Sequence, residues 1–298
     1  MPDVVCLGIL VADAIARPVP AVPPRGALAL VDELSLHGGG CALNTASALT
    51  RLGLSAAVCG KVGADPLGDF LVGVLDERGV DRRGVVRDPE SATSATVVLV
   101  EEDGERTFLH LPGANGLLRA EELDPDLLYA GRALHLAGAL VLDALDGEPA
   151  AAILAEAKAR GLVTSLDPVW DATGRWERLL PSLPQLDLLT ASLDEAEAIS
   201  GERGPEAAAE WLRSRGAATV AVTLGADGCW VTGVGRVPAP AVTAVDGTGA
   251  GDAFVAGFLY GMLEDRPPER CAALANRLGA LATTAVGAYA GLPDSAEA

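Results

Sequence analysis

Short apolar runs alternate with stretches of helical spacing along most of the chain. The runs at residues 4–9 and 56–63 are rich in valine and small apolar residues, and residues 41–53 between them carry apolar side chains at helical intervals. Such alternation is typical of α/β folds, in which helices cover a mostly parallel sheet. Further strands are predicted at 133–138, 162–167, 186–190 and 218–225, and further helices at 66–79, 148–160 and 192–201.

Two segments break this alternation. Residues 14–36 are rich in proline and small residues, and residues 94–111 alternate between apolar and polar side chains on both sides of an Asp103-Gly104 turn signal. The second pattern predicts a β-hairpin. Together the segments predict a small β appendage, which is either an edge decoration or a lid over a ligand at the carboxyl edge of the sheet. Since no repeat or low-complexity linker is visible, we expect one domain over residues 1–298 with lid insertions at these two places.

The charge balance narrows the classes of partner. The formal net charge is −19 at pH 7, and nucleic acids and anionic membranes are bound through basic patches. We therefore expect neither of them as a partner. No apolar run approaches the ~20 residues of a membrane span, and residues 1–10 lack the basic region of a secretory signal. These features predict a cytoplasmic protein.

The cysteines are scattered along the chain. None of the five stands in a C-x-x-C pair, so the sequence indicates neither a zinc motif nor a thioredoxin-type site. An odd number of cysteines with apolar neighbours is typical of buried thiols in a reducing compartment. The five are Cys6, Cys41, Cys59, Cys229 and Cys271.

A glycine-rich loop near the end of the chain carries candidate chemistry. Residues 246–251 read DGTGAG, follow a strand candidate at 242–245 and precede an apolar helix that is predicted to begin near Gly251. The first N–H groups of a helix lack partners, and glycines let an anion approach them closely, so the loop is a candidate anion cradle. It matches neither a Walker A loop nor the dinucleotide-binding fingerprint. Asp252, directly behind it, is either a helix cap or a catalytic base.

A second glycine loop opens a predicted helix in the first part of the chain. Gly38, Gly39 and Gly40 precede Asn44, whose amide both donates and accepts hydrogen bonds, as recognition of a polyol requires. Asp13 lies just past the first strand, at the edge where open α/β folds bind ligands. The structural alternatives are helix packing for the loop and Asn44, and a turn role for Asp13.

The segments GGCALN and DGTGAGDAFVAGF, residues 39–44 and 246–258, resemble the two signatures of the ribokinase-like, PfkB-type carbohydrate kinases. Shorter matches to the first strand, the lid hairpin, a nucleotide-phosphate loop and the last helix follow in the family's order along nearly the whole chain. The resemblance implies a ribokinase-like three-layer α/β/α fold with a mostly parallel central sheet and a small β lid. It also implies a homodimer in which two lids pair.

The resemblance further implies phosphoryl transfer from ATP to a sugar hydroxyl. Asp252 corresponds to the general base, and an aspartate of ordinary pKa is ionised at neutral pH and available to accept a proton. The N–H groups of Gly249, Ala250 and Gly251 would stabilise the charge that develops on the transferred group. The residues implied to bind the sugar are Asp13, Gly39, Gly40, Asn44 and Arg106.

The nucleotide half of the site follows from the same resemblance. Glu195 corresponds to the residue that organises Mg²⁺ through water, and Asp246 and Thr248 fall where relatives bind a monovalent cation such as K⁺. Two positions depart from the family pattern, since Ser192 replaces Asn and Gly247 replaces Thr. The residues implied to bind ATP are Ser192, Thr223, Gly225, Gly228 and Asn276.

We therefore expect an ATP-dependent sugar kinase. The alternatives are a nucleoside or vitamin-precursor kinase of the same fold, and a catalytically weak protein that binds sugar or nucleotide. Asp252 favours an enzyme, because a pure binding protein needs no base. Residues 169–176, VWDATGRW, replace the family's Asn-x-Arg, so the identity of the sugar and its reacting hydroxyl stay open. Structural roles are expected for His37, His110, His135, Trp170 and Trp176.

Overall fold

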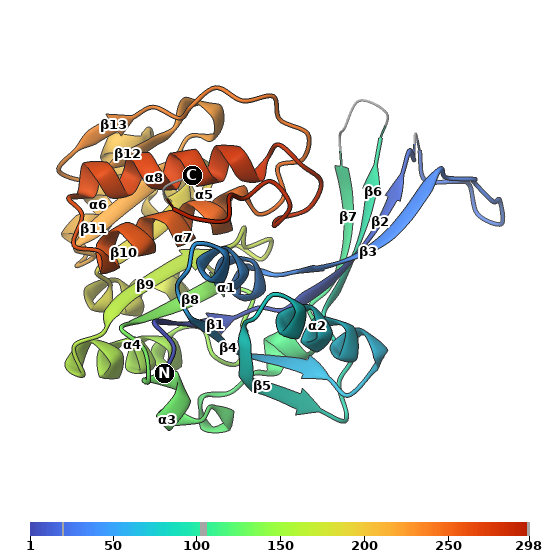
Figure 1. The fold of residues 1–298 in the computed structure, drawn as a ribbon, viewed down its shortest axis with the longest axis horizontal. Helices are drawn as coiled ribbons and strands as arrows, with labels where there is room; N and C mark the ends of the chain where they lie inside the picture. The colour runs from blue at the N-terminus through green and yellow to red at the C-terminus, as the bar shows by residue number, and fades with distance from the viewer. Residues whose placement is uncertain (20, 102–105, 297–298) are drawn as a thin grey trace.

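The protein is built around one large sheet in a computed structural model that describes residues 1–19, 21–101 and 106–296, without the side chain of Arg106 (Figure 1). The strands of this sheet are β1 (Val4–Gly8), β4 (Ala56–Gly63), β5 (Asp81–Asp88), β8 (Ala133–Ala139), β9 (Val163–Pro168), β10 (Leu188–Ser192), β11 (Thr219–Thr223), β12 (Cys229–Val231) and β13 (Gly235–Val237). They lie in the order β13-β12-β11-β10-β9-β8-β1-β4-β5. Neighbours from β11 to β5 are parallel, and β12 and β13 are antiparallel.

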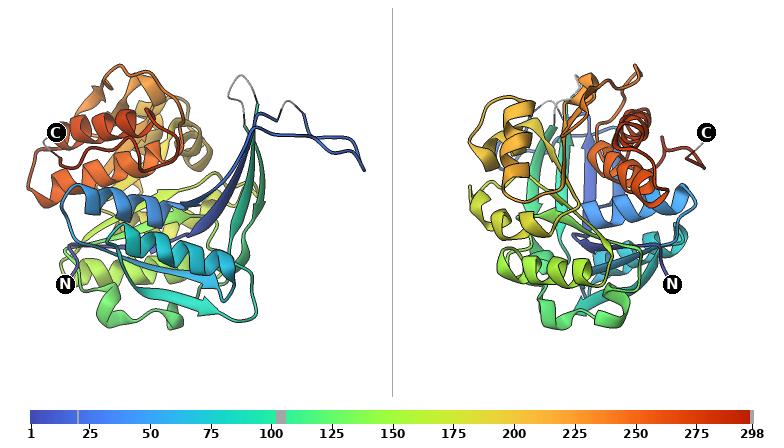
Figure 2. Two further views of the ribbon diagram at one scale, coloured as in Figure 1. Left: turned by 45° about the vertical axis from the view of Figure 1, so that its right-hand side comes forward. Right: turned by 90° about the vertical axis from the view of Figure 1, so that its left-hand side faces the viewer.

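Helices cover both faces of this sheet, as Figure 2 shows in its right-hand view. One layer holds α1 (Cys41–Arg51), α2 (Pro66–Glu77), α7 (Ala250–Leu263) and α8 (Pro268–Ala282). The other holds α3 (Pro125–Leu128), α4 (Glu148–Ala159), α5 (Leu193–Ser200) and α6 (Pro205–Ser214). Short 3-10 helices join the main elements: η1 (Gly113–Leu117), η2 (Ala120–Glu122), η3 (Trp176–Gln185) and η4 (Gly225–Asp227). The predicted three-layer α/β/α architecture is confirmed.

The central strand β1 shows why its sequence is a continuous apolar run. Val4 and Cys6 pack into the core beneath α1 and α7, whereas Val5 and Leu7 pack into the core beneath α3 and α4. A parallel strand covered by helices on both faces has no solvent side, so its residues do not alternate with polar ones. The two cores therefore hold the sheet rigid up to its carboxyl edge.

A second, four-stranded sheet projects from that edge in the order β3-β2-β6-β7. Its strands are β2 (Val11–Arg17), β3 (Glu33–Gly39), β6 (Ala95–Val100) and β7 (Arg106–Leu111). The predicted hairpin strands are confirmed as the antiparallel pair β6 and β7, while the Asp103-Gly104 turn lies outside the described residues. Because β2 starts soon after β1 ends and β3 runs into α1, this lid is tied directly to the carboxyl edge.

The register of the lid sorts its side chains into two faces. One row across the four strands consists of His37, Asp13, Thr96 and His110, which are direct partners and therefore share a face. The neighbouring row consists of Leu36, Ala14, Val97 and Leu109 on the opposite face. Leu109 is 62% exposed and Leu36 44% exposed, so the lid presents apolar side chains to solvent.

One predicted strand is wrong, and three strands of the large sheet, β5, β12 and β13, were not predicted. Residues 242–245 form no strand among the described residues, and Val245 is 61% exposed. This segment lies outside the sheet, and the N–H groups of Val245 and the following Asp246 donate instead to the carbonyl of Thr283 at the end of α8. Conversely, β5 was not predicted, because its sequence DRRGVVRD is charged. β5 is an edge strand paired with β4 alone, so polar side chains remain in water.

Candidate active site

Asp252 occupies the third position of α7 and is held by α1, which packs beside that helix. The amide Nδ2 of Asn44 donates a hydrogen bond of 2.8 Å to Oδ2 of Asp252. The hydroxyl of Thr45 lies 3.4 Å from the Asp252 backbone carbonyl, to which it donates. Asn44 is therefore brought to the catalytic candidate rather than left as a packing residue of α1.

The carboxyl of Asp252 does not have the ordinary pKa that we expected. Burial, and after it the negative charge of Asp167, together raise its pKa to about 7, against the opposing effect of hydrogen bonds from Asn44 and Cys41. Withdrawal from water disfavours the charged form, and a second carboxylate nearby disfavours it again. A group with this pKa is balanced between acid and base at neutral pH, which is suited to accepting a proton.

The N-terminus of α7 lies at the glycine loop that was predicted to be an anion cradle. Gly249 is the N-cap, with φ of +74°, and a Cβ there would overlap Ala288, so no other residue fits without strain. Gly251 has nothing within 4 Å of where its Cβ would be, which leaves space in front of the first helical N–H groups. The helix dipole and these N–H groups favour an anion at this place.

A cavity of about 310 Å³ opens in front of Asp252. Its lining includes Gly249 and Gly251 from the cradle, and Thr223 at the end of β11. Two further predicted residues, Ser192 and Glu195, line its wall. The fold thus gathers candidate catalytic and nucleotide-binding residues from three separate stretches of the sequence.

Ser192 keeps Glu195 in place despite the departure from the family pattern. Ser192 is the N-cap of α5, and its hydroxyl accepts from the N–H of Glu195, while Oε2 of Glu195 accepts from both the N–H and the hydroxyl of Ser192 at 2.8 and 2.7 Å. This reciprocal capping box fixes the glutamate side chain. Burial raises the pKa of Glu195, with the Ser192 hydrogen bonds opposing it.

A second cavity, of about 230 Å³, lies beneath the lid. Asp13 and Thr96 line it from the lid, and Asp246 and Thr248 line it from the loop that precedes α7. Burial raises the pKa of Asp13 to about 6, and a hydrogen bond from Thr96 opposes the shift. The loop 245–252 therefore contributes to both cavities.

The glycines of the first loop allow close approach around Asp13. A Cβ on Gly39 would overlap Oδ2 of Asp13, and Gly40 is the N-cap of α1 at φ +90° against the carbonyl of Ile9. A side chain at Gly39 would displace the Asp13 carboxyl group, and one at Gly40 would overlap the backbone of Ile9 and Leu10. Arg106 begins β7, and its side chain lies outside the described part of the structure.

Asp246 ties the glycine-rich loop to the C-terminal segment. Its Oδ1 accepts from the N–H and the hydroxyl of Thr248 at 3.0 and 2.7 Å, and its Oδ2 accepts from the N–H of Gly287 at 2.8 Å. The two predicted cation-site residues thus contact each other, and they anchor the loop that carries Gly249.

The remaining predicted ATP residues lie beyond the residues that line these two cavities. Gly225 and Gly228 adopt positive φ values of 58° and 94° around η4, where the chain turns from β11 into β12. The amide of Asn276 donates to the backbone carbonyls of Val237 and Pro238 at 2.9 and 3.4 Å. Asn276 therefore fixes the end of β13 against α8.

Sequence reasoning missed Cys41 and Asp167, which both line the cavity beside Asp252. Four of the five cysteines are buried, as expected, but Cys41 is the first residue of α1 and partly accessible. Its place directly after the glycine loop was an available signal. For Asp167 the signal was a carboxylate at the end of a buried strand, where the carboxyl edge of a parallel sheet gathers functional groups.

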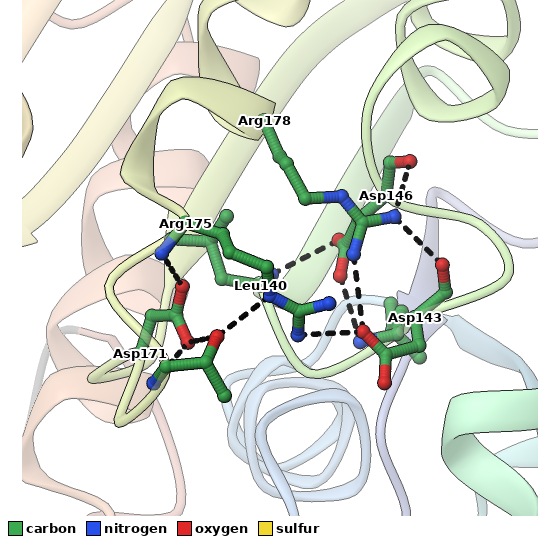
Figure 3. Close-up of polar contacts among 8 residues, drawn as sticks. Leu140, Asp143, Asp146, Asp171, Arg175 and Arg178 are labelled. Carbon is green, nitrogen blue, oxygen red and sulfur yellow. Dashed lines mark hydrogen bonds and ion pairs between the residues drawn. The ribbon is translucent and has the colours of Figure 1, made fainter.

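Residues 169–176, the loop that departs from the family pattern, are held by ion pairs (Figure 3). Arg175 and Arg178 converge on Oδ1 of Asp143 at 2.7 and 3.0 Å. Asp146 accepts from the N–H of Leu140 at 2.9 Å, so the loop after β8 is braced as well. These contacts stabilise the segment that follows Asp167 without occupying the cavity. They leave its tryptophans, Trp170 and Trp176, packed edge to face on each other, with Trp170 58% exposed.

The fold defines the class of protein. A ribokinase from Thermotoga maritima superposes with a TM-score of 0.85 at 24% identity, covering 100% of this chain and 97% of that one. A ribokinase II candidate from Escherichia coli, solved with ATP and Mg²⁺, superposes with a TM-score of 0.82 at 25% identity, covering 98% and 96%. The chain therefore has the ribokinase-like fold.

The sequence comparisons define the family. The pattern described as pfkB family carbohydrate kinase matches residues 1–295. A fructokinase from Klebsiella pneumoniae is 37% identical over 278 residues, which cover 86% of this chain and 88% of that protein. The chain belongs to the PfkB family of carbohydrate kinases, and it is a sugar kinase of this type, a phosphotransferase with an alcohol group as acceptor. None of the helices described here is long and apolar enough to cross a membrane.

The raised pKa of Asp252 sets the expected pH dependence. A carboxylate that acts as general base accepts a proton only when it is ionised. With Asp252 in this role, kcat/KM for the sugar should fall about tenfold per pH unit below about pH 7. Asp167→Asn removes the charge that raises this pKa, so the acidic limb should move to lower pH. The shift is measured from initial rates of the wild-type protein and of Asp167→Asn between pH 5 and pH 9. An acidic limb that does not move in Asp167→Asn would contradict the electrostatic cause.

Proposed function

We propose that the protein transfers the γ-phosphate of ATP to a hydroxyl of a small sugar of the ribokinase or fructokinase class, with Asp252 as general base. The observation that carries this proposal is the position of Asp252 in the first turn of α7. Asp252 lines the larger cavity, and the loop directly before α7 lines the lid cavity, so the two cavities adjoin at this residue. The Klebsiella relative supports a sugar acceptor, and the Escherichia coli structure supports ATP and Mg²⁺.

In this mechanism the sugar hydroxyl gives its proton to Asp252 as its oxygen attacks the γ-phosphorus, and ADP departs. Phosphoryl transfer depends mainly on positioning and on stabilisation of charge. Asn44 holds the Asp252 carboxyl in one orientation. The N–H groups of Gly249, Ala250 and Gly251 face the charge that spreads over the transferred group.

Mg²⁺ fits the donor set of the larger cavity. It prefers oxygen ligands and keeps several waters, and Glu195 supplies a carboxylate on the cavity wall. When bound with ATP, Mg²⁺ neutralises charge on the phosphates. We assign Ser192 to holding Glu195, and Thr223, Gly225, Gly228 and Asn276 to shaping the nucleotide half.

The lid cavity is assigned to the sugar. Of the proposed recognition groups, Asp13 lines this cavity, whereas Gly39, Gly40 and Asn44 belong to the first glycine loop and α1, outside its lining. Arg106 is a further candidate from β7. Asp246 and Thr248 are proposed to hold a monovalent cation such as K⁺, on the support that they anchor the loop beneath the anion cradle. A nucleoside or vitamin-precursor kinase remains the second candidate within the fold. We also keep the cytoplasm as the proposed location.

The exposed apolar face of the lid is proposed to pair with the lid of a second copy. Leu36, Val97 and Leu109 form one row on this face, and Leu34 and Leu111 extend it. An exposed apolar sheet face with open edges is a hazard unless it is covered. A second copy would cover this face with its own identical apolar face. The sugar cavity lies on the opposite face of the lid, so this pairing would leave it open.

The role of Asp252 is tested by Asp252→Asn, which keeps its shape and removes the proton acceptor. We expect kcat to fall by about 10²–10⁴-fold while ATP binding by calorimetry changes little. The matched control is Asp265→Asn, at the other end of α7. Undiminished turnover in Asp252→Asn would refute the assignment.

The two half-sites are separated by comparing Asp13→Ala with Thr223→Val. Loss of a buried hydrogen-bonding group costs roughly 1–3 kcal/mol, so Asp13→Ala should lower kcat/KM for the sugar about 5- to 150-fold and change the KM for ATP little. Thr223→Val should raise the KM for ATP and spare the sugar. Both constants are measured in both variants. Weakened ATP binding in Asp13→Ala with an unchanged sugar KM would overturn the arrangement.

The lid interface is tested by the mass in solution. Light scattering at micromolar concentration should give twice the chain mass, and Leu109→Glu should give the chain mass, because a charge would be buried without a partner. Val242→Glu, an exposed apolar residue away from the lid, is the control and should remain dimeric. A wild-type protein that is monomeric and fully active contradicts the proposal.

A further inference from the structure

The cavity in front of Asp252 contains an unexpected group of metal-binding side chains. One ligand atom each from Cys41, Asp167 and Asp252 lies within 4.8 Å of the others. They come from the start of α1, the end of β9 and the first turn of α7, so the tertiary structure and not a local motif brings them together. All three line the cavity, which gives an ion a path to them.

The buried polar atoms without a hydrogen-bond partner in the described structure include Oδ1 of Asp167 and Nε2 of His135. They lie 3.0 Å apart without the alignment of a hydrogen bond. His135 is fully buried, and its Nδ1 is already engaged by the hydroxyl of Ser165 at 2.8 Å. The two atoms therefore contact each other closely but make no hydrogen bond, which is costly in a protein interior.

The donor set selects the kind of ion. A thiolate with carboxylates suits a borderline-soft cation such as Zn²⁺, whereas Mg²⁺ prefers oxygen ligands and waters. Tetrahedral Zn²⁺, with bonds of about 2.0–2.3 Å, holds its ligand atoms roughly 3.3–3.8 Å apart. Side chains already within 4.8 Å reach this spacing by small rotations. His135 behind Asp167 would orient that carboxylate as an outer-shell partner.

We propose that Cys41, Asp167 and Asp252 bind Zn²⁺, with a fourth position open to the cavity, and that the bound ion inhibits the kinase. On binding, the Cys41 thiol releases its proton to solvent and the sulfur forms the bond to the metal. Asp252 then donates its electron pair to zinc and is withdrawn from proton transfer. The inhibition rests on the proposed function, whereas the binding of the ion does not.

The binding is tested with Co²⁺, which takes zinc sites and reports a thiolate ligand by a charge-transfer band in the near ultraviolet. Titration of the full chain without nucleotide should raise this band to saturation at a single equivalent. Zn²⁺ should abolish it, and millimolar Mg²⁺ should not. Cys41→Ser should lose the band, while Cys271→Ala, beside Gly261 at the far end of α7, should keep it.

Two further variants keep the test independent of any one substitution. Asp167→Asn should weaken Co²⁺ binding by at least about tenfold, and His135→Gln should weaken it by roughly 10–100-fold while keeping the band, as outer-shell changes do. Melting curves confirm that each variant is folded. The absence of a band in the wild-type protein, or an unchanged band in Cys41→Ser, would overturn the site.

Inhibition is measured separately, with ATP and Mg²⁺ in excess. Micromolar Zn²⁺ should lower kcat in wild-type protein and in Cys271→Ala, and a zinc-selective chelator should restore it. In Cys41→Ser, the same zinc concentration should lower kcat much less, when kcat is compared with that of the same variant without zinc. A cobalt band without zinc inhibition would leave the site intact and contradict the role of Asp252. Equal inhibition of Cys41→Ser would overturn the inhibitory part of the proposal.

Discussion

The hydrogen bond from Asn44 to Asp252 joins residues 208 positions apart, and the candidate active site depends on it. Burial at the N-terminus of α7 makes the Asp252 carboxylate costly to ionise, and the neighbouring Asp167 adds to that cost. Asn44 offsets part of it and fixes which oxygen faces the cavity. The candidate base therefore owes its environment to the packing of α1 and α7 together on one face of the sheet.

The lid fixes the position of Asp13 in the same way that helix packing fixes Asp252. Because β2 follows β1 closely and β3 runs into α1, the strand that carries Asp13 and the helix that carries Asn44 are tied to the same edge. The strand register then places Asp13, Thr96 and the two flanking histidines in one polar row, and leaves an apolar row on the opposite face. Recognition and association are thus assigned to opposite faces of one small sheet.

Where the sequence departs from the family pattern, other nearby contacts hold the local structure. Ser192 replaces an amide, yet its hydroxyl and N–H both hold Glu195. The loop after Asp167 has lost the family's Asn-x-Arg, and its arginines are instead engaged by Asp143 on the neighbouring loop. Specificity for the sugar is therefore carried by the lid and the first glycine loop in our proposal, and less by this braced segment.

The sequence by itself determined the α/β class, the lid strands, the two glycine loops and Asp252, because these are written in local periodicity, glycine placement and ordered motifs. It misjudged residues 242–245, since an apolar run becomes a strand only if a neighbouring strand is free to pair with it. The pKa of Asp252, the proximity of Cys41 and Asp167 to it, and the close contact between His135 and Asp167 were decided by the tertiary structure alone. Burial and electrostatic interaction depend on distances between residues far apart in the chain, and no local pattern of residues specifies those distances.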